Sequence, residues 1–246
     1  MSRGTALVTG GGRGIGHAIA RTLRRRGFAV AVFDQSPQPS EEMADVAYHS
    51  GDLAEIGGHE ALLEKIERHL GPLTCLVNNA GVTSLVRGDM LDLTPESFDR
   101  CLDINLRGTF FLSQALARRL IGRQADEGHR SLINITSANA EILGENRADY
   151  CMSKAGLSMM SRLFAARLAE ANIAVYEVRP GIIRTAMTQP AIEKYDSLIA
   201  DGGVPAKRWG EISDVAETVA SLACGALPFT TGTQIDVGGG LHLHRL

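Results

Sequence analysis

The chain has 246 residues, of which 44% are apolar and 22% charged, and its formal net charge is −3. This length and apolar content are enough to bury a full core as a single domain over residues 1–246, and two domains would each be small. The slightly negative charge gives no electrostatic footprint for nucleic acid or an anionic membrane, so we expect neither as a partner.

Strand and helix patterns alternate along the chain. Short runs rich in Val, Ile, Leu and Ala predict strands, with the turns that follow some of them, at residues 5–9, 28–34, 46–50, 73–81, 131–137, 173–181 and 233–240. Amphipathic patterns predict helices at residues 14–27, 59–71, 95–120 and 148–169, and a long helical stretch with insertions follows residue 181. This alternation predicts an α/β fold, a Rossmann-like doubly wound parallel sheet of about seven strands with helices on both faces.

The first turn, TGGGRGIG at residues 9–16, joins a predicted strand to a predicted helix. Glycines let the backbone pass close to a pyrophosphate, and the helix N-terminus supplies amide donors and positive potential. The turn, in this context, predicts a dinucleotide-binding site.

Asp34 ends the second predicted strand, at the position where an acidic residue can accept both hydroxyls of the adenosine ribose. A 2′-phosphate there would meet a like charge, at a cost of up to about 4 kcal/mol for a separation of ~4 Å and an effective dielectric of ~20. NAD is therefore favoured over NADP. Arg13 argues the other way, since it could reach a 2′-phosphate from the glycine turn, so NADP is not excluded.

Polar residues follow the third and fourth strands. Asp52 and Leu53 come after the third strand, where a contact with adenine and a turn or helix N-cap role are both open. Asn78 and Asn79 end the fourth strand at the carboxyl edge, where their amides could brace the strand ends against a cofactor or act as turn residues. Asn105 lies inside a predicted helix, where asparagine is unfavourable; a local kink that frees a carbonyl and a surface position are the two interpretations.

Tyr150 and Lys154 stand four residues apart in a helical pattern, so their side chains share one face at about 6 Å. A phenol has an unperturbed pKa near ~10, and a neighbouring ammonium favours the phenolate. Ser137 ends the apolar run LINIT, and its hydroxyl could hydrogen-bond the same substrate oxygen. The three residues predict a proton-transfer site that works beside a group that moves a hydride.

A turn follows the sixth predicted strand at Pro180 and Gly181, and it exposes backbone groups to a bound ring. The segment at residues 187–211 holds two prolines and a Gly-Gly pair. It is interpreted either as a mobile flap that closes over substrate or as a solvent-exposed insertion.

Neither the cysteines nor the terminal histidines form a metal-binding pattern. The chain contains four widely spaced cysteines: Cys75, Cys101, Cys151 and Cys224. We interpret them as reduced thiols, expect His242 and His244 to be exposed, and expect no metal site. No apolar run is long enough to span a membrane, and the first residues lead into a strand pattern without a signal sequence, so we expect a cytoplasmic protein.

Taken together, these motifs resemble the short-chain dehydrogenase/reductase family over nearly the whole chain. The resemblance rests on their order and spacing: TGGGRGIG at residues 9–16, NNAG at 78–81, Asn105, Ser137, YxxxK at 150–154 and PGxxxT at 180–185. It implies a hydride transfer between a nicotinamide cofactor and a ketone or secondary alcohol.

The resemblance also implies a role for each matching residue. Tyr150 would be the general acid in reduction and the base in oxidation, and Lys154 would lower its pKa and hold the nicotinamide ribose. Ser137 would polarise the substrate carbonyl, and Asn105 would position a water in a proton relay. The residues implied to line the cofactor are Gly10, Arg13, Gly14, Ile15, Gly16, Asp34, Asp52, Leu53, Asn79, Ala80, Gly81, Tyr150, Lys154, Pro180, Gly181, Ile183 and Thr185.

Within the family, the segment from Glu145 to Thr188 and the C-terminal TGTQIDVGGGL are similar to the 3-ketoacyl-acyl-carrier-protein reductase group. This similarity implies an acyl thioester substrate, although that group usually takes NADPH and Asp34 points to NAD. An acidic acyl carrier protein calls for a basic rim. Candidates for that rim are Arg118, Arg119, Arg123 and Arg130.

The alternative substrate is a small polyol or a sugar-derived ketone. It is favoured by the polar residues between Ser137 and Tyr150, namely Asn139, Glu141, Asn146 and Arg147. A cofactor-binding regulatory protein on the same scaffold is the competing class, but the full catalytic set argues against it. Family members are commonly tetramers, and an apolar row on the predicted helix at 148–169 leads us to expect a homotetramer. The row comprises Met159, Met160, Leu163 and Phe164.

Overall fold

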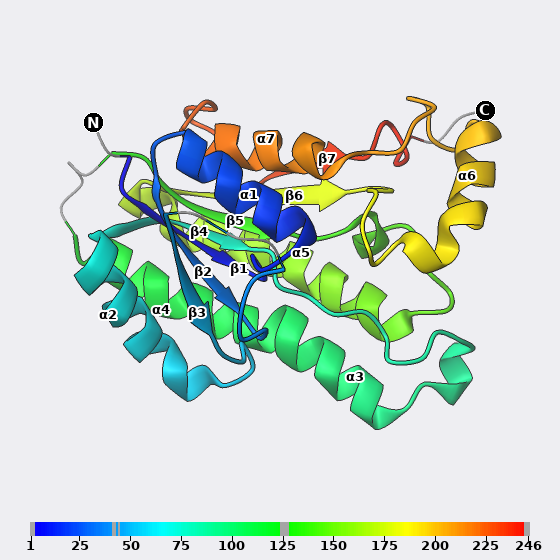
Figure 1. The fold of residues 1–246 in the computed structure, drawn as a ribbon, viewed down its shortest axis with the longest axis horizontal. Helices are drawn as coiled ribbons and strands as arrows, with labels where there is room; N and C mark the ends of the chain where they lie inside the picture. The colour runs from blue at the N-terminus through cyan, green and yellow to red at the C-terminus, as the bar shows by residue number, and fades with distance from the viewer. Residues whose placement is uncertain (1–2, 41–42, 44, 124–127, 244–246) are drawn as a thin grey trace.

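The computed structural model describes residues 3–40, 43, 45–123 and 128–243, and within them one parallel sheet organises the chain. The strand order is β3-β2-β1-β4-β5-β6-β7, which confirms the predicted doubly wound sheet (Figure 1). The strands are β1 (Thr5–Thr9), β2 (Ala29–Asp34), β3 (Val46–Ser50), β4 (Leu73–Asn78), β5 (Arg130–Ile135), β6 (Ile173–Pro180) and β7 (Thr233–Val237). The order reverses between β1 and β4, and the carboxyl ends of these two strands form the place where such sheets bind ligands.

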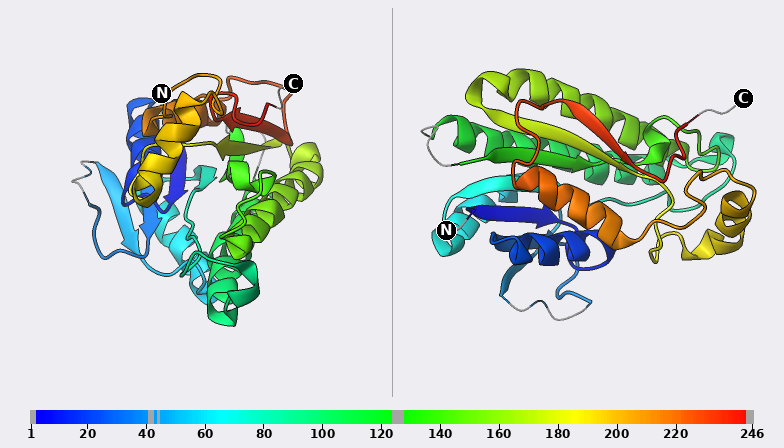
Figure 2. Two further views of the ribbon diagram at one scale, coloured as in Figure 1. Left: turned by 90° about the vertical axis from the view of Figure 1, so that its right-hand side faces the viewer. Right: turned by 90° about the horizontal axis from the view of Figure 1, so that it is seen from above.

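Helices cover both faces of the sheet. One face carries α1 (Gly14–Arg25) and α7 (Ile212–Ala223), and the other carries α2 (His59–Leu70), α4 (Thr109–Ile121) and α5 (Ala148–Leu168) (Figure 1). Two further helices, α3 (Pro95–Leu102) and α6 (Ile192–Ala200), lie towards the carboxyl end of the sheet (Figures 1 and 2). Short helical segments lie between these elements: η1 (Ile56–Gly58), η2 (Met90–Asp92), η3 (Asp103–Gly108), η4 (Ala138–Ala140), η5 (Ala169–Ala171) and η6 (Gln189–Ala191).

The core consists of two layers because side chains alternate across each strand. On β1, Ala6 and Val8 join the cluster under α1 and α7, whereas Leu7 joins the cluster under α2, α4 and α5. All three side chains are fully buried. The continuous apolar pattern of the predicted strands is therefore explained by a sheet that is covered on both faces.

The segment at residues 187–211 forms η6 and α6 and has a small apolar cluster of its own. Ile199, Val204 and Trp209 are each at most 8% exposed and pack with Ile182, which follows β6. The segment therefore covers the carboxyl end of β6 as a packed unit (Figure 2).

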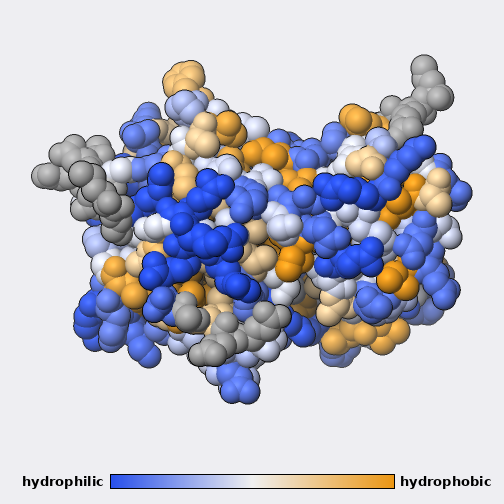
Figure 3. All heavy atoms as spheres, turned by 45° about the horizontal axis from the view of Figure 1, so that its top comes forward, coloured by the Kyte–Doolittle hydropathy of each residue, from blue (hydrophilic) through white to orange (hydrophobic). Residues whose placement is uncertain are grey.

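The surface is mixed in character, and Figure 3 shows many hydrophilic side chains among separate apolar patches on the face of α1 and α7. Arg25 and Arg26 at the end of α1 pair with Glu217 of α7. In the described part of the chain no helix is long and apolar enough to cross a membrane. Nor do three or more His, Cys, Asp or Glu side chains gather there as a metal site would require.

Three expectations about particular residues can be compared with the structure. In the apolar row on α5, Met160 and Phe164 are buried in the core, and only Met159 and Leu163 are exposed, by 52% and 60%. The four cysteines are free, as predicted, and Cys75 and Cys101 are buried. His242 is exposed and lies 4.0 Å from Asp236, while His244 lies outside the described residues.

Candidate active site

The glycine turn is tied to the end of β4 by a compact set of hydrogen bonds. The Thr9 hydroxyl accepts from the amides of Asn79 and Ala80 at 3.1 and 3.0 Å. The Asn79 side chain donates to the carbonyls of Thr9 and Gly10 at 3.1 and 3.0 Å. Asn78 is buried one residue earlier and donates to Ser113 and Asn134, each at 2.8 Å. The two asparagines therefore brace the strand ends.

The shape of this turn fits a pyrophosphate. Gly10 and Gly14 have φ values of 64° and 56°, which other residues rarely adopt. A Cβ at Gly16 would lie 2.2 Å from the Gly10 carbonyl oxygen, whereas a Cβ at Gly14 would meet nothing within 4 Å. The turn is thus packed against the protein on one side and open on the other, with the first amides of α1, including that of Ile15, beside the opening.

Asp34 ends β2 beside the glycine turn. Its two carboxylate oxygens accept from the amides of Gly12 and Ser36, each at 2.9 Å. Arg13 is exposed at the N-cap of α1, and its side chain makes no capping hydrogen bond. The structure therefore holds a negative charge firmly at the edge of the turn and leaves the nearby positive charge in solvent.

The segment after β3, which contains Asp52 and Leu53, forms a turn. The Asp52 side chain accepts from the Ala54 amide at 2.9 Å, which is the local turn role considered for it. Leu53 is buried, and its carbonyl oxygen lies 3.0 Å from His59 Nε2.

Asn105 lies in η3, a π-helical turn that separates α3 from α4. The predicted helix at 95–120 is therefore interrupted, and the surface interpretation of Asn105 is wrong, because its side chain is fully buried. Its Oδ1 accepts from the Val82 amide at 2.8 Å, and its Nδ2 donates to the Val82 carbonyl and to Ser153, each at 2.9 Å. A π-turn widens the backbone hydrogen-bonding pattern, as the kink interpretation requires.

Ser137, Tyr150 and Lys154 converge at the carboxyl end of β5. Ser137 follows β5, caps η4, and is hydrogen-bonded to the Tyr150 hydroxyl. Lys154 donates to the Ile135 carbonyl at 2.9 Å, and its Nζ lies 5.8 Å from the centre of the Tyr150 ring. A Cβ at Gly81 would lie 3.3 Å from Asn105 Oδ1 and 3.4 Å from Lys154 Nζ, so only a glycine leaves these two groups undisturbed.

The electrostatics of this group differ from the expectation. Burial raises the pKa of Tyr150, while the hydrogen bond with Ser137 and the positive charge of Arg147 act in the opposite direction. Burial also lowers the pKa of Lys154 to about 8. Desolvation of the phenolate thus outweighs the Ser137 hydrogen bond and the charge of Arg147.

Sequence reasoning missed a buried carboxylate next to the tyrosine. Asp149 is fully buried and accepts from Ser84, from Ser97 at 2.6 Å and from the Tyr150 amide at 2.8 Å. Burial acts to raise the pKa of Asp149, but the serine hydrogen bonds outweigh it and the pKa is lowered. The start of α5 is therefore anchored to the Ser84 loop and to α3; an acidic residue in the first helical turn was the available signal.

The turn after β6 reaches the other side of the site. Pro180 is the last residue of β6, and a Cβ at Gly181 would lie 2.7 Å from Gly238 Cα, which explains the glycine. The Thr188 hydroxyl donates to the Ile183 carbonyl at 2.8 Å and accepts from the Thr185 amide at 3.0 Å. The PGxxxT segment is thus folded into a compact loop in front of α6.

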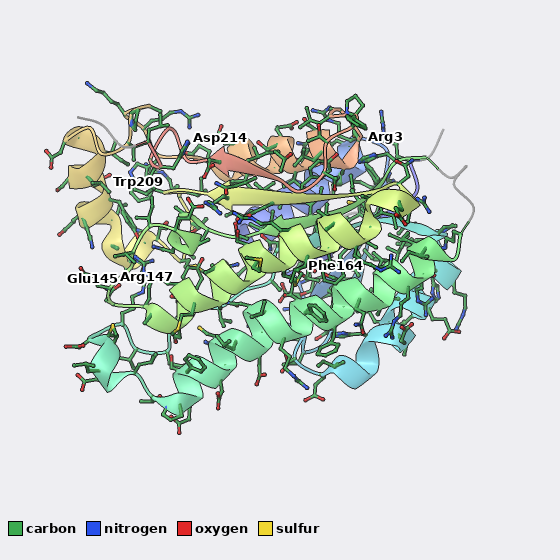
Figure 4. All side chains as sticks on the ribbon, turned by 180° about the vertical axis from the view of Figure 1, so that it is seen from behind. Arg3, Glu145, Arg147, Phe164, Trp209 and Asp214 are labelled. Atoms are coloured by element: carbon green, nitrogen blue, oxygen red, sulfur yellow. The ribbon has the colours of Figure 1, made fainter. Side chains whose placement is uncertain are left out.

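The polar wall predicted between Ser137 and Tyr150 is only partly free. Glu141 pairs with buried Arg179 at 2.7 Å, and the Asn139 side chain donates to the Ile142 carbonyl at 2.8 Å. Asn146 is exposed. Arg147 lies between the N-terminal end of α5 and α6 (Figure 4), and it donates to the Tyr195 hydroxyl at 3.3 Å.

The basic rim predicted for an acidic carrier protein is not beside this site. Arg123 donates to the carbonyl of Leu73, the first residue of β4, and Arg130, the first residue of β5, is buried. Arg119 pairs with Glu60 and Glu67. Three of the four arginines thus serve internal contacts at the amino edge of the sheet, opposite the site; only Arg118 is exposed.

The fold and the clustered Ser, Tyr and Lys side chains define a doubly wound nucleotide-binding oxidoreductase. A family model described as enoyl-(acyl carrier protein) reductase matches residues 10–242. The chain belongs to the short-chain dehydrogenase/reductase family.

Three similar proteins cover nearly the whole chain. The 3-oxoacyl-acyl-carrier-protein reductase FabG of Haemophilus influenzae is 34% identical over 244 residues, which are 97% of this chain and 98% of that protein. The crystal structure of a 3-oxoacyl-acyl-carrier-protein reductase from Brucella melitensis in complex with NAD is 45% identical, with a TM-score of 0.94 and full coverage of both chains. A gluconate 5-dehydrogenase from Burkholderia cenocepacia in complex with NADP and tartrate is 28% identical, with a TM-score of 0.89, covering 98% of this chain and 96% of that one.

Proposed function

We propose that the protein interconverts a ketone and a secondary alcohol with NAD(H), and that its substrates are 3-oxoacyl compounds. The observation that carries this proposal is the convergence of Ser137, Tyr150 and Lys154 at the carboxyl end of β5, beside an open glycine turn. Hydride transfer is supplied by the nicotinamide when it is bound, and the protein supplies position and a proton.

Each residue of the site has a separate task in this proposal. In reduction, Tyr150 donates a proton to the substrate oxygen while Ser137 hydrogen-bonds the same oxygen. Lys154 would hold the nicotinamide ribose, and its charge favours the phenolate that remains. Asn105 holds the backbone at Val82 and opens the helix at η3, where a water can join the proton path. Ile183 and Thr185, in the loop closed by Thr188, would orient the carboxamide.

We propose NAD as the preferred cofactor. Asp34 is held by two backbone amides at the edge of the turn, where the adenosine ribose would lie, and its charge opposes a 2′-phosphate. The residues proposed to contact the pyrophosphate belong to the open side of the turn, including Gly14 and Ile15. Asp52, Leu53, Ala80 and Gly81 follow the neighbouring strands and complete the proposed cofactor site.

The mouth of the site favours an acyl chain over a polyol. Leu85, Val86 and Leu143 are 55%, 80% and 85% exposed, on two loops joined by a hydrogen bond from the Gly88 amide to the Asn146 carbonyl at 3.2 Å. Two of the four residues of the predicted polar wall, Glu141 and Asn139, have partners of their own and are not free to bind hydroxyls. An acyl carrier protein as partner and a cytoplasmic location stay predictions.

We also propose that the protein assembles as a homotetramer through α4 and α5. Met159 and Leu163 on α5 are exposed, and exposed apolar side chains that lie together commonly mark a surface for association. Light scattering at micromolar concentration tests this proposal, and a monomer would reject it.

The reaction is tested by the rate of NADH loss with an acetoacetyl thioester. A rate that disappears in Tyr150→Phe supports the proposal, whereas a rate that persists in that variant rejects it. Binding of NADH, followed by its fluorescence, serves as the folding control because the substitution removes only one hydroxyl.

A further inference from the structure

A positive charge, that of Arg147, lies beside Tyr150 at the start of α5. Arg147 is the N-cap of α5 and stands three residues before Tyr150, and its positive charge is close enough to act on the pKa of the Tyr150 hydroxyl. Its guanidinium reaches the Tyr195 hydroxyl of α6 at 3.3 Å, and its Nε is buried without a hydrogen-bond partner (Figure 4). Arg147 therefore lies between the tyrosine and the segment that covers the site.

Arg147 has no carboxylate partner among the described residues, and it differs in this from Arg119, Arg123 and Arg179. Arg179 pairs with Glu177 and Glu141, and Arg119 and Arg123 both pair with Glu67. Partial removal of a guanidinium from water without an anionic partner costs free energy. Such a group therefore favours the binding of an anion that can accept its hydrogen bonds.

The acidic groups around Arg147 are engaged by other residues. Glu141 is held by Arg179, Asp196 accepts from the Trp209 indole at 2.7 Å, and Asp149 is enclosed by serines. Glu145 and Glu193 are exposed. The charged groups that remain at the substrate position are Arg147 and Lys154, so the site favours an anion.

We propose that Arg147 binds the carboxylate of a short hydroxy or oxo acid, whose hydroxyl or ketone lies at Tyr150. The inference rests on the proposed function and extends it from thioesters to free acids. In the oxidation of 3-hydroxybutyrate, the carbon-bound hydrogen leaves as hydride to the nicotinamide and the hydroxyl proton passes to Tyr150. The products are the 3-oxo acid and NADH, and the carboxylate is unchanged. A planar guanidinium suits this group because it offers two parallel donors.

The test compares 3-hydroxybutyrate with its neutral methyl ester in the wild type and in Arg147→Gln. Loss of one partner of a desolvated charge pair lowers binding by about 30-fold or more, so Arg147→Gln is expected to reduce the acid-to-ester ratio of kcat/KM by at least that factor. The ratio cancels any effect of the variant on Tyr150. Arg147→Lys should restore part of it, and Lys194→Gln, which removes an exposed charge from α6, should leave the ratio unchanged. An equal loss for acid and ester would overturn the inference.

Binding gives a second readout that needs no turnover. Trp209 is the single tryptophan, and its ring lies 5.8 Å from that of Tyr195, so its emission reports on this side of the site. We expect 3-hydroxybutyrate to change the Trp209 emission saturably in the wild type and in Arg147→Lys, but not in Arg147→Gln. If no ketone is turned over but this binding pattern holds, the proposed reaction fails and the carboxylate site stands. If the emission responds equally in Arg147→Gln, the carboxylate site fails.

Discussion

Removal of the negative charge at Asp34 should weaken the preference for NADH over NADPH. At ~4 Å and an effective dielectric of ~20, one like charge opposes a 2′-phosphate by about 4 kcal/mol, which corresponds to roughly 700-fold. Asp34 is only half-buried, so solvent and salt reduce this, and we expect a preference of about 30-fold or more in kcat/KM. Asp34→Asn keeps an oxygen for one of the two amide hydrogen bonds. It should bring the ratio of kcat/KM with NADH to kcat/KM with NADPH to about tenfold or less.

The matched control is Arg13→Gln, which removes the exposed cation on the same turn. It should lower the residual rate with NADPH and leave the rate with NADH close to that of the wild type. Initial rates at several concentrations of each cofactor give both ratios. A wild type that uses NADPH as well as NADH would refute the electrostatic reasoning, and so would an Asp34→Asn variant with an unchanged ratio.

Three further predictions concern the proton-transfer site and its support. Because burial raises the pKa of Tyr150, the rate of alcohol oxidation should rise with pH into the alkaline range, while ketone reduction should stay flat to about pH 8. Ser137→Ala removes a bond that lowers this pKa and should move the oxidation profile to higher pH; an unchanged profile would contradict that role. The pKa of Asp149 is lowered in the fold, so its stabilisation is present above the unfolded value of about 3.9 and is lost as pH falls below it. Asp149→Asn should lower the free energy of unfolding by about 1–3 kcal/mol at pH 7, measured in urea, and a difference that persists unchanged at pH 3 would count against this explanation.

Much of the fold could be predicted because its signals are local. Buried strands give continuous apolar runs, and the helix with Tyr150 and Lys154 carries its own period. The glycine turn was recognisable because Gly10 and Gly14 need positive φ and Gly16 needs close approach to backbone. The position of Asp34 at the end of β2 followed from the length of that strand.

The errors arose where the answer depends on three-dimensional placement. The predicted arginine rim was wrong because Arg123 and Arg130 flank the start of a strand, and strand starts lie at the edge opposite the site. Asn105 was found by its poor helix propensity, but the π-turn that buries it inserts one residue per turn and leaves no periodic signal. The pKa of Tyr150 depends on burial, which sequence spacing with Lys154 does not report.

The most direct test of the central claim is the initial rate of NADH loss with acetoacetyl-N-acetylcysteamine, measured for the wild type and for Tyr150→Phe. The account predicts turnover by the wild type, loss of at least about 10³-fold in the variant, and NADH binding that is nearly the same in both. Turnover by Tyr150→Phe close to that of the wild type would contradict the assignment of Tyr150 as the proton donor.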